Sequence, residues 1–91
     1  MAVLLVGYDL RKQGRDYKRL IELIQTYTHC HALGSMWFID TNKKPGEVRD
    51  HLDTALDSND QLYVIRLHHH WGASQKDECT DWLQDARRTW D

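Results

Sequence analysis

The sequence lacks any long hydrophobic run and has no strong excess of one charge. Its longest uninterrupted apolar stretch, Ala2 to Val6, is far shorter than the roughly 20 residues that cross a bilayer, which excludes an integral membrane protein. A net charge of -2 argues against a protein that coats nucleic acid through its overall field, although it is compatible with a local basic patch. No Ser-His-Asp order, phosphate-binding loop or dinucleotide fingerprint is present.

Cysteine is scarce as well. Cys30 and Cys79 share no CxxC spacing, and the first residues, MAVLLVGYDL, lack the basic region and small-residue cleavage site of a signal peptide. We therefore predict free thiols in a cytoplasmic protein. Cys79 has no activating neighbour, so a nucleophilic role is not expected for it.

Length and composition predict one globular domain over residues 1–91. The chain has 91 residues, of which 41% are hydrophobic and 29% charged, and no linker or repeat divides it. We expect a core over about residues 2–67 and a closing helix over about 75–90. So small a domain leaves apolar surface that a partner could cover, which favours self-association.

Hydrophobic spacing predicts the secondary structure. Strands are expected at about 2–8, 29–33, 36–41 and 61–67, and helices at about 17–27, 45–56 and 75–90. One longer bent strand is the alternative to the two strands around Gly34-Ser35. The hairpin between the helices favours a split β-α-β fold over a doubly wound sheet. The predicted fold class is therefore α+β, a ferredoxin-like β-α-β-β-α-β sandwich with an additional C-terminal helix.

Three short motifs resemble those of a known family. Val6-Gly7-Tyr8-Asp9-Leu10, followed by a basic loop and a helix, resembles the opening of the small CRISPR-associated "Cas-two" proteins. Ser35-Met36-Trp37-Phe38-Ile39 and Asn59-Asp60-Gln61-Leu62-Tyr63-Val64-Ile65 are similar to segments of SinR-like relatives of that family. The order of these motifs carries the resemblance, which covers about residues 2–67.

The resemblance implies a ferredoxin-like homodimer. In that family the Asp at the end of the first strand, here Asp9, meets its dimer mate and has been assigned a metal-dependent nuclease role, whereas other members are non-catalytic scaffolds that hold DNA. The C-terminal region departs from the family. A helix bearing Trp82 and Trp90 replaces the strand that often crosses to the partner.

Asp9 and the basic residues around it are the candidate site. Two copies of Asp9 near a two-fold axis could bind Mg²⁺ or Mn²⁺, whereas the simpler alternative is that Asp9 accepts hydrogen bonds from the loop N–H groups of Lys12 to Gly14. The candidate nucleic-acid-binding residues are Arg11, Lys12, Arg15, Lys18 and Arg19. Cations at a helix N-terminus oppose the helix dipole, which favours a phosphate-binding role. The alternative is a solvated face that Asp16 and Glu22 partly compensate.

Histidine and tryptophan offer weaker candidates. His29 and His31 share one strand face, and His68 to His70 end another strand. The two strands are expected at opposite edges of the sheet, so zinc binding by histidine is not expected. Trp71, beside Gly72, is the tryptophan most suited to stacking on a base.

The leading hypothesis is a Cas-two-like homodimeric, nucleic-acid-associated protein, with Asp9 at the dimer axis. If catalytic, it would be an endonuclease that hydrolyses phosphodiesters with Mg²⁺ or Mn²⁺. One alternative is a non-catalytic dimeric scaffold or adaptor that binds protein or DNA. The second alternative is a toxin-like ribonuclease. Fold analogy does not decide among these functions.

Overall fold

Four strands form one antiparallel sheet in a computed structural model that describes residues 1–11 and 17–90. The strands are β1 (Ala2–Asp9), β2 (Thr28–Leu33), β3 (Met36–Thr41) and β4 (Gln61–Arg66). Their order in the sheet is β2-β3-β1-β4, and every neighbouring pair is antiparallel. β1 is an interior strand, as its continuous apolar run predicts, whereas β2 and β4 are the edges.

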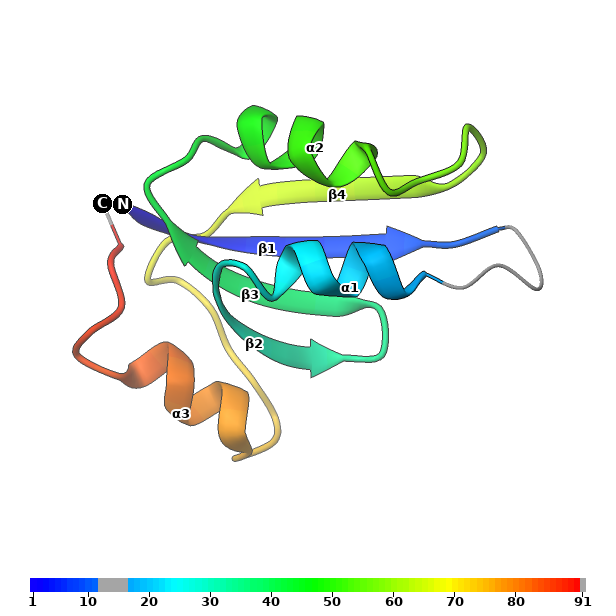
Figure 1. Cartoon of the computed structure of the whole chain (residues 1–91). Helices are drawn as coiled ribbons and strands as arrows, with labels where there is room; N and C mark the ends of the chain where they lie inside the picture. The colour runs from blue at the N-terminus through cyan, green and yellow to red at the C-terminus, as the bar shows by residue number, and fades with distance from the viewer. Residues whose placement is uncertain (12–16, 91) are drawn as a thin grey trace.

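Three helices accompany the sheet: α1 (Lys18–Ile24), α2 (Pro45–Asp53) and α3 (Glu78–Gln84). Along the chain the elements follow one another as β1, α1, β2, β3, α2, β4 and α3. Figure 1 shows α1 and α2 over the sheet and α3 set apart from them, beside β2. No helix of the described residues is long and apolar enough to cross a membrane.

The first face of the sheet packs against α1 and α2. Alternate residues of β1, such as Leu4 and Val6, point to this face. On each helix, two buried apolar residues four positions apart lie on the same side and pack against them. The buried cluster consists of Ala2, Leu4, Val6, Leu20, Ile24, Trp37, Ile39, Val48, Leu52 and Ala55. Pro45 opens α2, where it costs no hydrogen bond, and Glu47 accepts the Lys44 backbone N–H at 2.9 Å.

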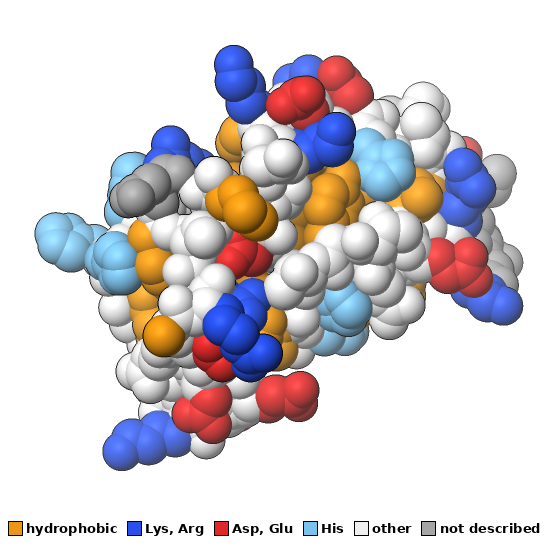
Figure 2. Space-filling view, turned by 60° about the vertical axis from the view of Figure 1, so that its left-hand side comes forward, with side chains coloured by type: hydrophobic (Ala, Val, Ile, Leu, Met, Phe, Trp, Pro, Cys, Tyr) orange, Lys and Arg blue, Asp and Glu red, His pale blue; other side chains and the backbone are white. Residues whose placement is uncertain are grey.

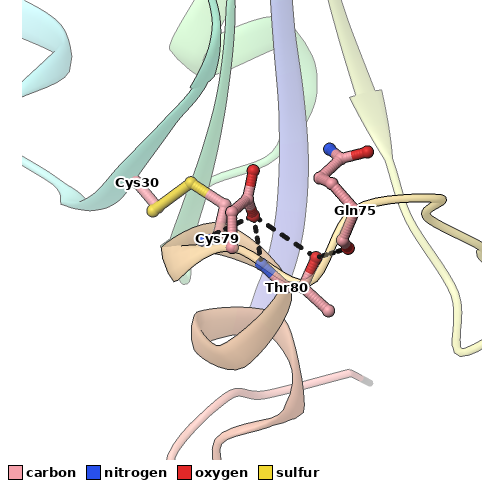
Figure 3. The surroundings of a disulfide bond; sticks show 5 residues. Cys30, Gln75, Cys79 and Thr80 are labelled. Carbon is pink, nitrogen blue, oxygen red and sulfur yellow. Dashed lines mark hydrogen bonds between the residues drawn. A yellow bond between two sulfur atoms is a disulfide. The ribbon is translucent and has the colours of Figure 1, made fainter.

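The second face of the sheet is covered in part by α3 and the C-terminal segment. Cys30 of β2 and Cys79 of α3 form a disulfide, with their Cα atoms 5.8 Å apart (Figure 3). Asp77 caps α3 by accepting the backbone N–H groups of Cys79 and Thr80, each at 3.1 Å. Beyond the helix, the Thr89 backbone N–H donates to Asp40 of β3 at 3.0 Å. Helical structure therefore lies on both faces of the sheet.

This layering corrects the predicted fold class, the ferredoxin-like β-α-β-β-α-β sandwich with an additional C-terminal helix. A sandwich of one helical layer and one sheet leaves the second sheet face free. Here α3 and residues 85–90 form a third layer on that face, tied to the sheet by the disulfide and by Asp40. The structure is a small α+β fold with a four-stranded antiparallel sheet in the order β2-β3-β1-β4 and three helices.

The closing helix is also shorter than the expected 75–90. It begins only after the Asp77 cap, and it ends at Asp85, whose ψ of 135° is extended. The Asp85 carboxylate accepts the Arg87 backbone N–H at 2.8 Å, a local bond that competes with continuation of the helix. The apolar residues up to Trp90 thus lie in a segment that turns over Asp85–Arg88, outside the helix.

The prediction of free thiols is wrong, because Cys30 and Cys79 are both in the disulfide. They lie 49 residues apart, so no local spacing signals their pairing. Only the packing of α3 against β2 brings them together. The prediction of a cytoplasmic protein rests in part on free thiols. The disulfide removes this argument, because structural disulfides persist mainly in oxidising compartments.

Cys79→Ser should destabilise the fold. Loss of a cross-link over 49 residues is expected to lower the free energy of unfolding by about 2–4 kcal/mol, because the unfolded chain regains conformational freedom. Urea denaturation followed by circular dichroism measures this loss. Reductant should shift wild type by a similar amount and leave Cys79→Ser unchanged; a wild-type midpoint that is insensitive to reductant would contradict the prediction.

Candidate functional site at the Asp9 end of the sheet

Asp9 is the last residue of β1 and stands opposite Gln61 of β4. Its side chain is 60% exposed, and its Oδ2 accepts Arg11 Nε at 2.9 Å and lies 2.8 Å from Arg11 Nη2. An ion pair this exposed contributes little to stability, about 0–1 kcal/mol. The strand therefore places Asp9 in solvent, with one cation already beside it. The alternative bonds from Lys12 to Gly14 lie outside the described residues.

Asp60 is the carboxylate that organises this end of the sheet. Its side chain accepts the Arg11 backbone N–H, the Tyr17 hydroxyl and the Asp57 backbone N–H, each at 2.8 Å. These bonds join the chain leaving β1, the start of α1 and the turn that leads into β4. From the sequence, Asp60 is part of a motif of resemblance and of a run of turn residues, and it is not among the predicted site residues. Its place in a turn-forming Asp-Ser-Asn-Asp segment was the available signal for such a role.

Three members of the predicted basic group, Arg11, Lys18 and Arg19, lie within the described residues. Lys12 and Arg15 lie outside the described residues, so no contact of theirs enters the geometry. Lys18 and Arg19 are exposed on α1, and Lys18 Nζ is 3.8 Å from Glu22 Oε1, one helical turn away. That pair is the compensation expected of a solvated face. Arg11 directs its guanidinium to Asp9 and its backbone to Asp60, so it links the two carboxylates.

No group of three or more His, Cys, Asp or Glu side chains within residues 1–11 and 17–90 is placed to hold a metal ion. Four of the six histidines, His29, His31, His51 and His69, contact aromatic rings. His31 stacks on Trp37 with ring centroids 3.9 Å apart, and His29 lies 5.6 Å from the same ring. His69 lies 4.6 Å from Trp90, beyond the opposite edge strand. His29 and His31 thus share a face, as predicted, and that face is occupied by Trp37.

The second face of the sheet is uncovered beyond the reach of α3. Tyr63 and Ile65 of β4 are 71% and 50% exposed, and they stand opposite Gly7 and Leu5 of β1. Because side chains alternate along a strand, Asp9 lies on this side of the sheet too. We call Leu5, Gly7, Tyr63 and Ile65 the open face. Large apolar side chains gathered on one uncovered sheet face are typical of a binding surface.

Charge is mixed on the side of the molecule that Figure 2 presents. Acidic and basic side chains are interspersed there, with hydrophobic patches between them and histidines projecting at one edge. A field of one sign, which would steer nucleic acid to the surface, is absent from that view.

No protein-family model matches the chain, and no solved structure matches it significantly. The resemblance to the CRISPR-associated family therefore stays a prediction from short motifs.

Asp60→Ala should destabilise the fold more than Asp9→Ala. Removing the Asp60 carboxylate leaves the donors at Arg11, Tyr17 and Asp57 without their acceptor, which is expected to cost about 1–3 kcal/mol. Asp9→Ala removes one exposed ion pair and should cost under about 1 kcal/mol. Chemical denaturation of both variants measures the difference. Equal losses would show that Asp60 does not organise this end of the sheet.

Proposed function

We propose that this chain is a homodimeric binding protein, a non-catalytic scaffold whose two copies meet through the open face. The observation that carries the proposal is the exposure of Tyr63 and Ile65 on a sheet face that α3 covers elsewhere. Burying an aromatic and a β-branched side chain together provides the apolar centre that stable interfaces need. The dimer expected from the sequence resemblance agrees with this use of the surface.

A second copy is the partner that fits the open face best. An isologous contact pairs one patch with itself, and Tyr63 and Ile65 offer an apolar strip that is complementary to its own copy. The Asp9–Arg11 pair stands at the end of the strip and is neutral as a unit. Its charges would lie at the rim of a dimer, where neither is buried without its counter-ion.

The dimer would present a protein partner with the mixed charges of its outer surface. Arg11 is paired with Asp9, and Lys18 stands beside Glu22, so these cations lack the uncompensated character of a phosphate-binding patch. This pairing favours a scaffold that binds a protein over a scaffold that binds DNA.

Ile65→Lys should weaken dimerisation. A charge placed in the apolar centre of the contact is expected to raise the dimer dissociation constant about tenfold or more. Sedimentation velocity over a range of concentrations measures the constant. The matched control is Ile21→Lys, which places the same charge at an exposed isoleucine of α1 and should leave dimerisation unchanged. Wild type that stays monomeric at high concentration would overturn the proposal.

A second candidate is a metal-dependent endonuclease, and the position of Asp9 favours it. Asp9 is exposed on the same side as the open face, so a two-fold axis there would bring its two copies toward each other. Carboxylate oxygens suit Mg²⁺ or Mn²⁺, and the ion would neutralise charge during phosphodiester hydrolysis. The fit is partial, because each chain supplies one carboxylate and Arg11 already occupies it.

In this candidate Arg11 would turn from Asp9 to a substrate phosphate, and Lys18 and Arg19 would contact the nucleic-acid backbone. Nothing in the described residues favours the toxin-like ribonuclease over these two functions. Cytoplasmic location stays a prediction from the N-terminal sequence, and the disulfide is a reason to expect an oxidising compartment instead.

Asp9→Asn should separate the two candidates. If the chain is a nuclease, wild type should cleave short DNA or RNA with Mg²⁺ or Mn²⁺ and not with EDTA, and Asp9→Asn should lose about a hundredfold or more in rate. Asp53→Asn, which changes an exposed carboxylate of α2, is the matched control and should cleave like wild type. Equal cleavage by all three proteins indicates contaminating nuclease, and absence of cleavage supports the scaffold.

A further inference from the structure

Arg88 is a buried cation without hydrogen bonds from its side chain. The side chain is only 6% exposed, and Nε and Nη1 are sealed from solvent with no hydrogen-bond partner among the described residues. A buried guanidinium normally satisfies its N–H groups, since each unsatisfied donor is costly. Nη2 is not one of the sealed atoms, so it is the nitrogen through which Arg88 can meet a molecule outside.

The nearest carboxylate does not compensate Arg88 fully. Asp40 is 4% exposed and lies 3.8 Å from Arg88 Nη1, which is beyond hydrogen-bond distance. Both Asp40 oxygens are committed to Thr89: one accepts the backbone N–H and the other the hydroxyl. The other contact of the guanidinium is with the Trp82 ring, whose centroid is 4.2 Å away. Arg88 is thus held in place by an ion pair and a cation–π contact, while its Nε and Nη1 donate no hydrogen bond among the described residues.

Arg88 lines a cavity of about 740 Å³ between the loop after β4 and the C-terminal segment. Trp71, Trp90 and His69 supply flat surfaces in its wall, and Lys76 supplies a second cation. Asp85 also lines the cavity, but hydrogen bonds from Arg87 lower the pKa of that carboxyl and pair its charge. A cavity of this volume is in the range of small-molecule sites, and its wall combines flat aromatic surfaces with polar and charged groups.

We propose that this cavity binds a small aromatic carboxylate, with the acid group at Arg88 and the ring between Trp71 and Trp90. Arg88 Nη2 would donate a charge-assisted hydrogen bond to a carboxylate oxygen of the ligand, which uses a donor that Asp40 leaves unpaired. A single negative charge suits the site better than a dianion, because Asp40 and Asp85 stand nearby. The tryptophan rings would cover the apolar body of the ligand.

Titration with benzoate, followed by two-dimensional NMR of the isotope-labelled full chain, tests the site. Benzoate should shift the indole N–H signals of Trp71 and Trp90 and the Arg88 side-chain signals in a saturable way. Benzyl alcohol has the same ring without the charge and should bind about tenfold more weakly or worse. Equal affinity for the two probes, or no saturable shift at millimolar benzoate, would overturn the proposal.

Variants locate the binding. Arg88→Lys keeps the charge and loses the Nη2 donor that can reach the cavity, so benzoate affinity should fall about fivefold or more. Arg87→Lys makes the same change at an exposed neighbour and should bind like wild type. If Arg88→Lys unfolds, Trp90→Leu removes the stacking surface and leaves Arg88 intact, and it should weaken benzoate binding as well. Affinity that is unchanged in both the Arg88 and Trp90 variants would show that the anion binds elsewhere on the surface.

Discussion

Burial of the start of β1 on both of its faces is the constraint on which the rest of the structure depends. Leu4 and Val6 point to α1 and α2, while Val3 and Leu5 point to the other side, and Val3 and Leu4 are fully buried. A strand that is apolar on both sides is stable only when both sides are covered. The chain meets this need with α3 and the C-terminal segment. The disulfide holds α3 on the second face at the β2 edge, where a seven-residue helix alone would bury little surface.

The elements could be predicted from the sequence more fully than their layering. The continuous run of β1 and the spacing of Leu20 and Ile24 or of Val48 and Leu52 are local signals, so the strands and the first two helices lie close to the expected residues. Periodicity does not say which sheet face a helix covers. It also could not show that Cys30 and Cys79 pair, because their contact depends on tertiary packing across 49 residues.

Of the candidate site, only its position at the end of β1 could be predicted from the sequence. Asp9 ends β1 as expected, because strand ends are marked by the change from apolar to polar residues. Its pairing with Arg11 and the role of Asp60 as an acceptor for three segments depend on how the loops fold back, which no local pattern encodes. The closing helix expected over 75–90 would place Arg88 near a helix C-terminus, where a cation is favourable. The structure buries it instead, since the chain leaves the helix at Asp85 and packs against Asp40.

The Arg88 cavity and the Asp9 end of the sheet lie toward opposite ends of β1. Asp9 pairs with Gln61 at the last position of the strand, whereas Asp40, the partner of Arg88, stands opposite Val3 near its start. Asp9 lies six positions after Val3 along the extended strand, a span of about 20 Å. A carboxylate at Arg88 would therefore make no contact with Asp9. Leu5 of the open face lines a second cavity, which shares Trp71 and Leu83 with the Arg88 cavity, so both the loop after β4 and α3 connect the two surfaces.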